Sequence, residues 1–386
     1  MNPAEVLTRV RELGPGLRVR AREAEDRRSL PDETVKELKE TGLVRLLQPA
    51  RFGGYEADPR YFYEACLAVA AACGSTGWVA GVVGVHPWQI AHWDESTQQE
   101  VWGEDPDTWV SSSYMPVGRH TKAEDGFLLS GRWSFSSGCD HCQWVILGCL
   151  EEQEGGPPVM WNAILPRPDY RIDDVWDPVG LRGTGSNDIV VEEAFVPSRR
   201  MLNVPEMFQW SSPGLAVNTN PLYRMPFASM FANAITVSII GMGEGMLEET
   251  LQHTKSRVSL TWGEARSDPH LLSAIGQAAS DISASRGQLL QNIAAMYEVV
   301  CNGEPIPMEF RRRCRRDQVA GSKRAIEAID ACYDRAGARA INLSSPLQRF
   351  WKDAHTGRHH TINSIEHSFA DWALTEMGFD STDVMI

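Results

Sequence analysis

The stretch that decides the fold is IGQAASDISASRGQLLQNIAAMYEVV, residues 275–300, in which apolar residues recur at intervals of seven, four and three. The recurring residues are Ile275, Ile282, Leu289, Ile293, Met296 and Val300. This period places them on one face of a long α-helix. A second stripe of the same kind consists of Ile326, Ile329, Tyr333 and Ala336. Long amphipathic helices bury such stripes against one another, so residues 213–386 are predicted to form a four-helix bundle.

The chain before this bundle has two different textures. Residues 1–108 show helical spacing, clearest from Asp32 to Leu47, where Pro31 and Asp32 are suited to open a helix. The run Gln48–Tyr55 is rich in Pro and Gly and predicts a loop. Residues 109–212 carry short alternating apolar runs: Gly126 to Ser134, Trp144 to Leu150, Val159 to Leu165 and Ile189 to Val196. These runs predict a small central β-domain, which is expected to be a β-barrel. Residues 211–225 predict a linker or an active-site loop.

Composition limits the kind of partner. The 386 residues are 42% hydrophobic and 23% charged, as in a globular protein of more than one domain. The net charge of −14 repels nucleic acid and anionic membranes. Small molecules and copies of the same chain are the expected partners. The N-terminal residues mix both charge signs, unlike a signal peptide, so we expect a cytoplasmic protein. The apolar stretch from Phe231 to Met242 is too short and too interrupted to predict a membrane span.

No metal site is predicted. Cys139 and Cys142 have zinc-ligand spacing, but no second Cys/His pair follows, so packing is the favoured interpretation. The cluster His355, His359 and His360 has no companion set of Asp, Glu or Cys ligands. The basic run 311–316 is expected to be the solvated start of a helix.

Five short motifs carry a family resemblance. They are Cys73-Gly-Ser-Thr-Gly-Trp78, Gly84-Val-His-Pro-Trp88, Gly131-Arg-Trp-Ser-Phe-Ser-Ser-Gly138, Leu181-Arg-Gly-Thr-Gly-Ser186 and Asp353-Ala-His-Thr-Gly-Arg-His-His360. In this order, and within helices, then a β-domain, then a bundle, the chain resembles the class D two-component flavin monooxygenases of the acyl-CoA dehydrogenase superfamily. That group includes the oxygenase components of p-hydroxyphenylacetate hydroxylase, of a steroid-degrading phenol hydroxylase and of dibenzothiophene monooxygenase.

The resemblance implies a mostly α fold of acyl-CoA dehydrogenase type and a particular chemistry. A separate NAD(P)H flavin reductase would supply reduced FMN or reduced FAD, and dioxygen would add to form a C4a-hydroperoxyflavin. An aromatic, mainly phenolic, substrate would then be hydroxylated by a homotetramer. The same chemistry on nitrogen or sulfur is one alternative. An acyl-CoA dehydrogenase is another, but its Tyr-Glu-Gly-Thr type motif is missing, and residues 353–360 stand in its place.

The resemblance also assigns catalytic residues. His360 matches a histidine over the flavin C4a edge, with His355 and His359 as rivals and a solvated helix face as the structural alternative. Such a site must be dry and must offer a fixed hydrogen-bond donor. His86 and Ser112 match the substrate grip of the phenol hydroxylases. A histidine near neutrality can draw off a phenol proton, although His86 could equally be a buried histidine with a backbone partner.

The expected flavin contacts come from several segments. Ser137, the first choice, and Ser136 match the segment beside the flavin ring, where a hydroxyl can bond N5 or O4. Trp78 would form a flat wall of the pocket. Further contacts implied by the resemblance are Arg182, Thr184 and Ser186 on the flavin face, Arg224 near N1 and O2, and Arg257 toward the flavin tail or a neighbouring subunit. The run Arg182–Asn187 lacks the spacing of a dinucleotide fingerprint, so no Rossmann site is expected.

Overall fold

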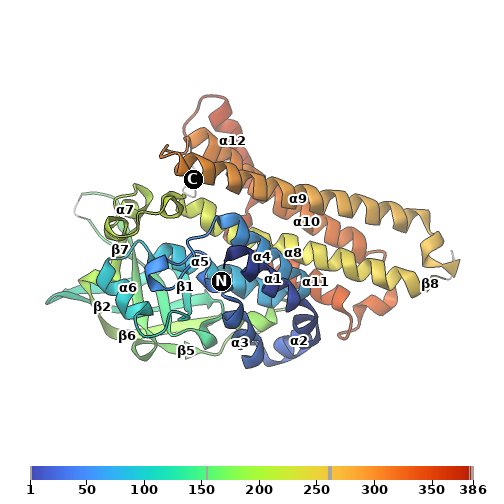
Figure 1. Ribbon diagram of the computed structural model, residues 1–386, viewed down its shortest axis with the longest axis horizontal. Coiled ribbons are helices and arrows are strands. Elements are labelled where there is room, and N and C mark those ends of the chain that lie inside the picture. The colour runs from blue at the N-terminus through green and yellow to red at the C-terminus, as the bar shows by residue number, and fades with distance from the viewer. Residues whose placement is uncertain (1, 154, 260–262, 382, 384–386) are drawn as a thin grey trace.

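A computed structural model describes residues 2–153, 155–259, 263–381 and 383 (Figure 1). The chain begins with six helices: α1 (Pro3–Glu12), α2 (Gly14–Arg27), α3 (Asp32–Thr41), α4 (Pro59–Ala72), α5 (Gly74–Ile90) and α6 (Glu95–Trp102). The helical interpretation of this region is confirmed, but the helix expected to reach Leu47 is too long. Gly42 has φ 80° and ends α3, and a short 3-10 turn follows from Leu43 to Arg45. A glycine in the left-handed conformation commonly ends a helix. The apolar spacing continues beyond Gly42, and for that reason the helix was predicted to be longer than it is.

The central domain is one seven-stranded mixed sheet with the strand order β5-β6-β2-β1-β3-β4-β7. Its strands are β1 (Val110–Ala123), β2 (Gly126–Ser136), β3 (Trp144–Glu151), β4 (Val159–Pro166), β5 (Arg171–Asp173), β6 (Asn187–Pro197) and β7 (Met201–Asn203). All four predicted runs are strands. β1 pairs with β3 in parallel near its start and with β2 in antiparallel fashion near its end. No pairing joins the edge strands β5 and β7 within the described residues, so the expected barrel is open there.

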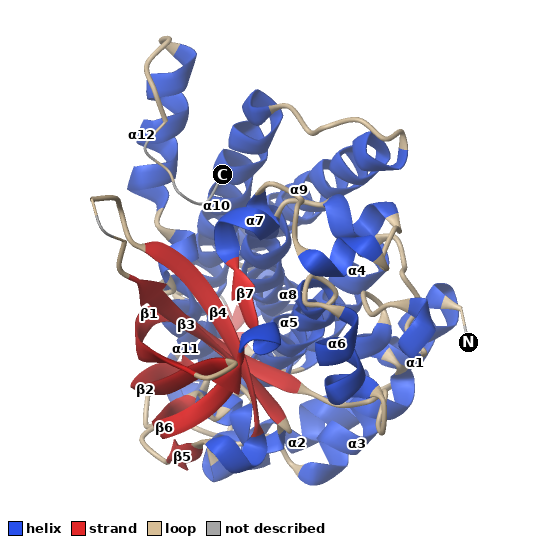
Figure 2. Ribbon diagram, turned by 90° about the vertical axis from the view of Figure 1, so that its left-hand side faces the viewer, coloured by secondary structure: helices blue, strands red, loops and turns tan. Residues whose placement is uncertain are grey.

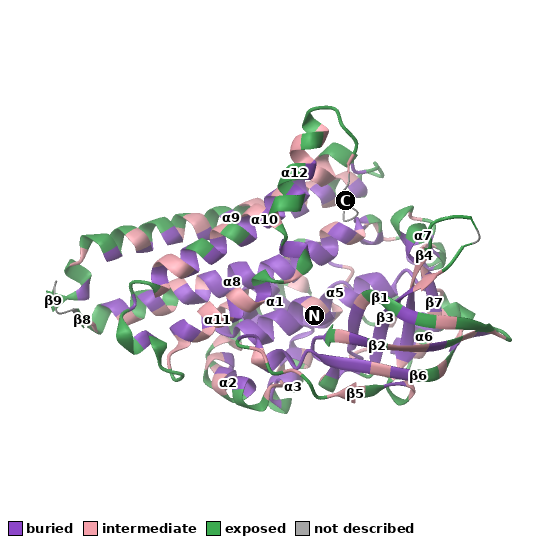
Figure 3. Cartoon of the chain, turned by 180° about the vertical axis from the view of Figure 1, so that it is seen from behind, coloured by how far each residue is buried: buried purple, intermediate pink, exposed green. Residues whose placement is uncertain are grey.

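The C-terminal region is the predicted bundle. It contains α8 (Phe227–Ser256), α9 (Pro269–Cys301), α10 (Met308–Tyr333) and α11 (Pro346–Arg358), reached through the short helix α7 (Val204–Phe208). All six apolar residues of the 275–300 stripe are buried, and α9 packs along α10 and α8. Outward faces of α9 and α10 are exposed, whereas α8 is mostly buried (Figure 3). The last helix, α12 (Ile365–Glu376), projects from the bundle (Figure 1).

Helix α8 is the centre of the molecule. It packs against α4, α5, α9, α10 and α11. Its length and composition would suffice to cross a membrane, but 89% of its most apolar window is buried inside the protein. A core helix surrounded by other elements is apolar on all sides for that reason. Helix α5 contacts β1, and the start of α8 reaches the same strand, where Phe227 and Phe231 meet Tyr114; Figure 2 shows the sheet on this side of the helices.

Candidate active site

Helix α5 carries two of the predicted site residues, Trp78 and His86. It lies unusually close to its neighbours, because a Cβ on Gly77 would meet the Ala70 backbone at 2.4 Å and one on Gly81 would meet the Ala234 carbonyl oxygen at 2.5 Å. Only glycine permits such approach. Trp78 and His86 are eight residues apart, which is about 12 Å along a helix. The two side chains therefore belong to neighbouring but separate parts of the site.

The first part is a chain of hydrogen bonds around Trp78. The indole Nε1 of Trp78 donates to the Ser137 hydroxyl at 3.2 Å, and Ser137 Oγ lies 2.8 Å from Ser186 Oγ. Ser186 Oγ lies in turn 2.6 Å from Thr184 Oγ1, which donates to the Leu181 carbonyl. All of these hydroxyls are buried. The structure thus brings together four residues from three separate segments of the sequence that the resemblance placed at the flavin.

His360 adjoins this chain, with its ring centroid 5.9 Å from that of Trp78. It follows α11, and its Nδ1 accepts a hydrogen bond from the backbone N–H of Ile362 at 3.3 Å. Burial, helped by the nearby positive charge of Arg315, lowers the pKa of His360 to about 4. A neutral imidazole that accepts at Nδ1 carries its proton on Nε2. His360 is therefore a hydrogen-bond donor at Nε2.

The two rival histidines lie elsewhere. His355 Nε2 is 2.7 Å from Asp330 Oδ1, and its ring packs on Trp351 with centroids 4.6 Å apart. His359 is exposed. Of the three histidines, His360 is the one placed against Trp78, so the geometry favours it over its rivals and over a solvated helix face.

Asp353 connects α11 to the loop that supplies Thr184 and Ser186. Its Oδ1 accepts a hydrogen bond from the Leu181 backbone N–H at 2.6 Å. Leu181 has φ 54°, an uncommon conformation for a leucine. Burial raises the pKa of Asp353 to about 7, although the bond from Leu181 opposes this rise. Asp353 is thus a buried carboxyl group that holds the loop in position.

The second part of the site surrounds His86. Its side chain is completely buried, and Nδ1 lies 2.6 Å from the Val110 carbonyl oxygen. A carbonyl oxygen can only accept, so Nδ1 carries the proton. Burial lowers the pKa of His86 to about 4, and the bond to Val110 opposes this change. Nε2 is buried and has no hydrogen-bond partner within the described residues. An unpartnered buried lone pair is costly unless a ligand satisfies it.

Aromatic rings enclose His86. Phe231 and Tyr114 lie with their centroids 5.8 and 6.3 Å from that of His86. Phe227 stacks on Phe231 at 4.3 Å and meets Tyr114 edge-on at 5.7 Å. These three residues were not predicted, because rings from a strand and from a helix meet only in the folded chain. The period of α8, which sets Phe227 and Phe231 four apart, was the available signal.

Polar groups complete this second part. Tyr114 donates from its hydroxyl to Gln89 Oε1 at 2.5 Å, and Gln89 Nε2 donates to Asn162 Oδ1 at 3.0 Å. Burial raises the pKa of Tyr114 well above its usual value, and a hydrogen bond with Ser112 opposes that rise. Ser112 is buried two residues before Tyr114 on β1. The predicted pair His86 and Ser112 therefore lies at one cluster of aromatic rings with polar edges.

The residues beside Ser137 are suited to a flavin. Ser136 Oγ is buried and has no hydrogen-bond partner in the described part of the chain. Phe135, its neighbour, has φ 68° and a side chain that is 69% exposed. The Phe135 ring meets Trp176 edge-on at 6.1 Å. A free hydroxyl next to an exposed aromatic ring in a strained conformation is typical of a binding site. These donors and flat surfaces fit an isoalloxazine ring.

The three predicted flavin arginines lie outside this cluster. Arg182 is bonded to Asp177 Oδ1 at 2.6 Å and to the Pro178 carbonyl at 3.0 Å. Arg224 is exposed. Arg257 follows α8 and donates to the Arg335 carbonyl. Within one chain, none of these three guanidinium groups is bonded to the Trp78 hydroxyl chain, and their roles at the flavin stay predictions.

The basic run at the start of α10 differs from the expected solvated surface. Arg315 is buried and donates to the Ile362 carbonyl, two residues from His360, while Arg316 pairs with Asp317 at 2.6 Å. Arg311 lines a cleft described below. The Cys139 and Cys142 thiols are buried and donate to the Gly185 and Gly138 carbonyl oxygens, respectively. The contacts of these two thiols belong to the packing of the protein interior.

Fold and site together define a flavoprotein of the acyl-CoA dehydrogenase type. The family model of the acyl-CoA dehydrogenase N-terminal domain matches residues 11–105, and that of the C-terminal domain matches residues 234–365. The oxygenase subunit HsaA of a flavin-dependent monooxygenase from Rhodococcus jostii (strain RHA1) is 44% identical, over 98% of this chain and 100% of the relative. The chain belongs to the oxygenase components of the flavin-dependent monooxygenases, which confirms the predicted class.

Two further comparisons agree. The crystal structure of 3-HSA hydroxylase from Rhodococcus sp. RHA1 is similar with a TM-score of 0.95 and 45% identity, and it covers 99% of each chain. The oxygenase component of an FADH(2)-dependent resorcinol hydroxylase from Rhizobium sp. (strain MTP-10005) is 32% identical over 89% of this chain and 87% of the relative. The chain is therefore a flavin-dependent monooxygenase with the acyl-CoA dehydrogenase fold.

Proposed function

We propose that this oxygenase hydroxylates a phenolic substrate held in the pocket of His86, with reduced flavin supplied by a separate NAD(P)H flavin reductase. The observation that carries the proposal is the buried, unpartnered Nε2 of His86, whose tautomer the Val110 carbonyl fixes. A phenol hydroxyl would satisfy this lone pair, and the phenol ring would pack against Phe231 and Tyr114. The names of the relatives, among them a resorcinol hydroxylase, point to the same class of substrate.

His86 would act on the substrate in a simple way. Because its pKa is lowered to about 4, the imidazole stays neutral at physiological pH and keeps Nε2 free to accept. Acceptance of the phenol hydrogen bond moves electron density into the ring and favours attack by an electrophilic oxygen. Ser112 and Tyr114, beside it on β1, would orient the phenol oxygen.

His360 would act on the oxygen and not on the phenol. Bound reduced flavin supplies two electrons and, with dioxygen, the electrophilic oxygen atom. The hydrogen bond from the Ile362 N–H to Nδ1 leaves the proton of neutral His360 on Nε2. This Nε2–H would donate a hydrogen bond to the oxygen atom derived from dioxygen before that atom is transferred to the substrate. His360 itself is half-buried, and the neighbouring residues Trp78 and Ser137, which are buried, would help to limit access of water to this donor.

The flavin would be held mainly at its ring. Ser136, with its free hydroxyl, and the Ser137–Ser186–Thr184 chain offer hydrogen bonds to the ring edge. These contacts do not discriminate FMN from FAD, so we propose that either reduced form is accepted. We further propose a homotetramer, because the projecting α12 region exposes Phe369, Leu374, Met377 and Phe379, an apolar surface of the kind that subunit contacts cover.

Two alternatives are less well supported. A dehydrogenase needs a carboxylate base at the substrate, but the carboxyl group of Asp353 in the 353–360 segment accepts from Leu181 and is committed to that loop. Oxidation of a nitrogen or sulfur lone pair needs no base, and it would leave the His86 Nε2 without a partner.

The deciding experiment mixes anaerobic protein and reduced FMN, or reduced FAD, with oxygenated buffer and a phenol, and measures hydroxylated product and hydrogen peroxide. Wild type should yield product that carries one atom of ¹⁸O from labelled dioxygen. His86→Ala should lower the phenol hydroxylation rate by about 100-fold, the scale of a lost general base, and should form peroxide instead. A thioether that wild type oxidises serves as the control, because it has no proton to remove. Equal phenol hydroxylation by wild type and His86→Ala contradicts the proposal.

A further inference from the structure

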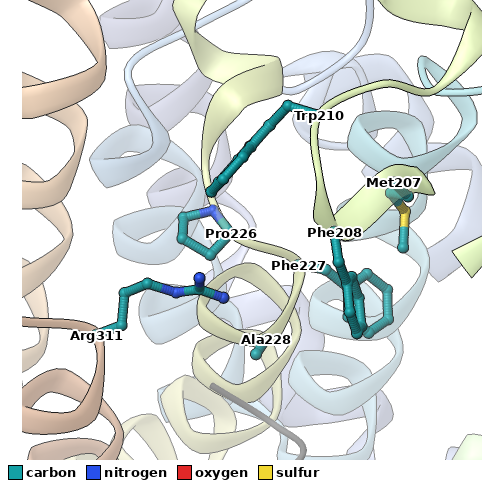
Figure 4. A pocket seen from close by; sticks show the side chains of 7 residues that line it. All are labelled: Met207, Phe208, Trp210, Pro226, Phe227, Ala228 and Arg311. Carbon is teal, nitrogen blue, oxygen red and sulfur yellow. The ribbon is translucent and has the colours of Figure 1, made fainter. Parts of the chain in front are cut away.

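A cleft beside the aromatic rings that enclose His86 contains Arg311, whose guanidinium group has no carboxylate partner among the described residues. The cleft is lined by Met207, Phe208, Trp210, Pro226, Phe227, Ala228 and Arg311. Figure 4 shows Arg311 reaching from α10 toward Pro226 and Ala228 at the start of α8, with Phe208 and Phe227 beyond. Apart from the guanidinium group, the lining side chains are apolar or aromatic. Arg311 also lines an adjoining cleft between α8 and α10 that includes Asn233 and Arg315.

The guanidinium of Arg311 lacks the partners that its neighbours have. Its Nε is buried without a hydrogen-bond acceptor, and among the described residues no carboxylate lies within ion-pair distance of it. The guanidinium carbon lies 5.9 Å from the centre of the Trp210 ring. Arg315 and Arg316, by contrast, pair with Asp383 and Asp317. Burial lowers the pKa of Arg311, as expected where no negative charge compensates.

The cleft adjoins the aromatic rings that enclose His86. Phe227 lines the cleft with one side and stacks on Phe231 with the other, and Phe231 contacts His86. Only these two rings separate Arg311's cleft from the histidine along this path. A long substrate that reaches both places would require the Phe227 ring to rotate aside. A substrate with a phenol at His86 would then extend along the aromatic rings and reach Arg311 with its far end.

We propose that Arg311 is a specificity-determining residue that binds a carboxylate at the end of an apolar arm on the phenolic substrate. The inference rests on the proposed function, because it takes the phenol end to lie at His86. A carboxylate suits a guanidinium better than a neutral acceptor does, since the pair forms two parallel charge-assisted hydrogen bonds. The apolar lining of the cleft would strengthen the pair and would accept the arm.

The test compares matched substrates. ω-(4-Hydroxyphenyl)alkanoic acids of increasing chain length and their methyl esters are assayed for hydroxylation by wild type, Arg311→Gln and Arg311→Lys. Wild type should show a KM about tenfold lower for the acid than for the ester at one favoured chain length, the worth of one charge-assisted contact. Arg311→Gln should bring that ratio to about one, and Arg311→Lys should keep part of it. Arg313→Gln is the control, because Arg313 is exposed and packs on Phe310 instead.

Three results would overturn the inference. An acid-to-ester ratio near one in wild type at every chain length would show that the cleft does not bind a carboxylate. A loss in Arg311→Gln of the affinity difference between reduced FMN and reduced riboflavin would assign the guanidinium to the flavin phosphate. A change in sedimentation of Arg311→Gln, with the acid preference intact, would assign it to a subunit contact. In each case continued hydroxylation of the esters leaves the proposed function standing, whereas no hydroxylation of any phenol would remove both.

Discussion

His86 and His360 are fixed as opposite neutral tautomers. His86 donates through Nδ1 to the Val110 carbonyl and leaves the Nε2 lone pair free, whereas His360 accepts at Nδ1 from Ile362 and presents Nε2–H. Burial lowers both pKa values to about 4, so neither ring is charged near neutrality. One histidine can therefore only accept, and the other can only donate, at the atom turned away from the backbone. An oxygenase needs both functions at different reactants.

Loss of the His360 donor should uncouple oxygen use from product formation. His360→Ala should raise hydrogen peroxide release per flavin oxidised about tenfold or more, because the oxygen loses its fixed hydrogen bond, while the affinity for reduced flavin stays nearly the same. The measurement is the ratio of peroxide to hydroxylated product at saturating phenol. His359→Ala, at the exposed neighbouring position, is the matched control. If both variants are coupled like wild type, His360 has no such role.

The Trp78–Ser137 hydrogen bond should contribute to flavin binding. Trp78→Phe keeps an aromatic ring against His360 but removes the donor to Ser137, and Ser137→Ala removes the hydroxyl. Each should weaken reduced-flavin binding about five- to tenfold, which corresponds to roughly 1 kcal/mol for one hydrogen bond. Anaerobic titration of reduced FMN and reduced FAD measures this. Unchanged dissociation constants in both variants would place the flavin ring elsewhere.

Stability should fall in acid because of His86. Its folded pKa of about 4 lies below the usual 6.5, so between pH 6.5 and 4 the unfolded chain binds a proton that the folded chain does not. The contribution of His86 to the free energy of unfolding should therefore decrease over that window and level off below it. His86→Gln cannot titrate, and its loss between pH 6.5 and 4 should be smaller by about 3 kcal/mol, from the size of the shift. Urea unfolding at several pH values tests this, and parallel pH curves for the two proteins would contradict it.

Asp353 should give the opposite slope. Its folded pKa is raised to about 7 from 3.8, so the folded chain holds a proton that the unfolded chain releases, and stability falls as pH rises from 4 to 7. Asp353→Asn keeps the acceptor for Leu181 without the charge. It should equal wild type at pH 4 and exceed it at pH 8, by at most about 4 kcal/mol. Asp353→Ala should lose stability at both pH values, because the Leu181 N–H loses its partner.

Periodic patterns allowed most of the fold to be predicted. The stripe from Ile275 to Val300 is buried as its spacing implied, and the alternating runs became strands. The stop at Gly42 was missed, because hydrophobic spacing does not register a residue that changes the backbone direction. A barrel was predicted where the sheet is open, because pairing between edge strands leaves no trace in a local pattern.

The site was predicted unevenly. Short motifs located Trp78, Ser137, Thr184, Ser186 and His360, whose contacts the structure then supplied. Physical spacing alone could not have joined them, since they come from α5 and from the segments after β2, before β6 and after α11. Tyr114, Phe227 and Phe231 escaped notice because an aromatic residue in an apolar stretch reads as ordinary core. Arg311 was taken for surface because neighbouring arginines obscured the one that lines a cleft.

Helix α8 forms a wall of both halves of the site. Near its start Phe231 touches His86, and five residues later Thr236 is hydrogen-bonded to Gln318 and Asn363, next to the turn that orients His360. That separation is about 7.5 Å along one rigid helix. The substrate-side ring and the support of the distant donor are therefore held at a fixed separation by one helix. Relative placement of the two reactants would thus be set by the backbone of α8 and not by a flexible loop.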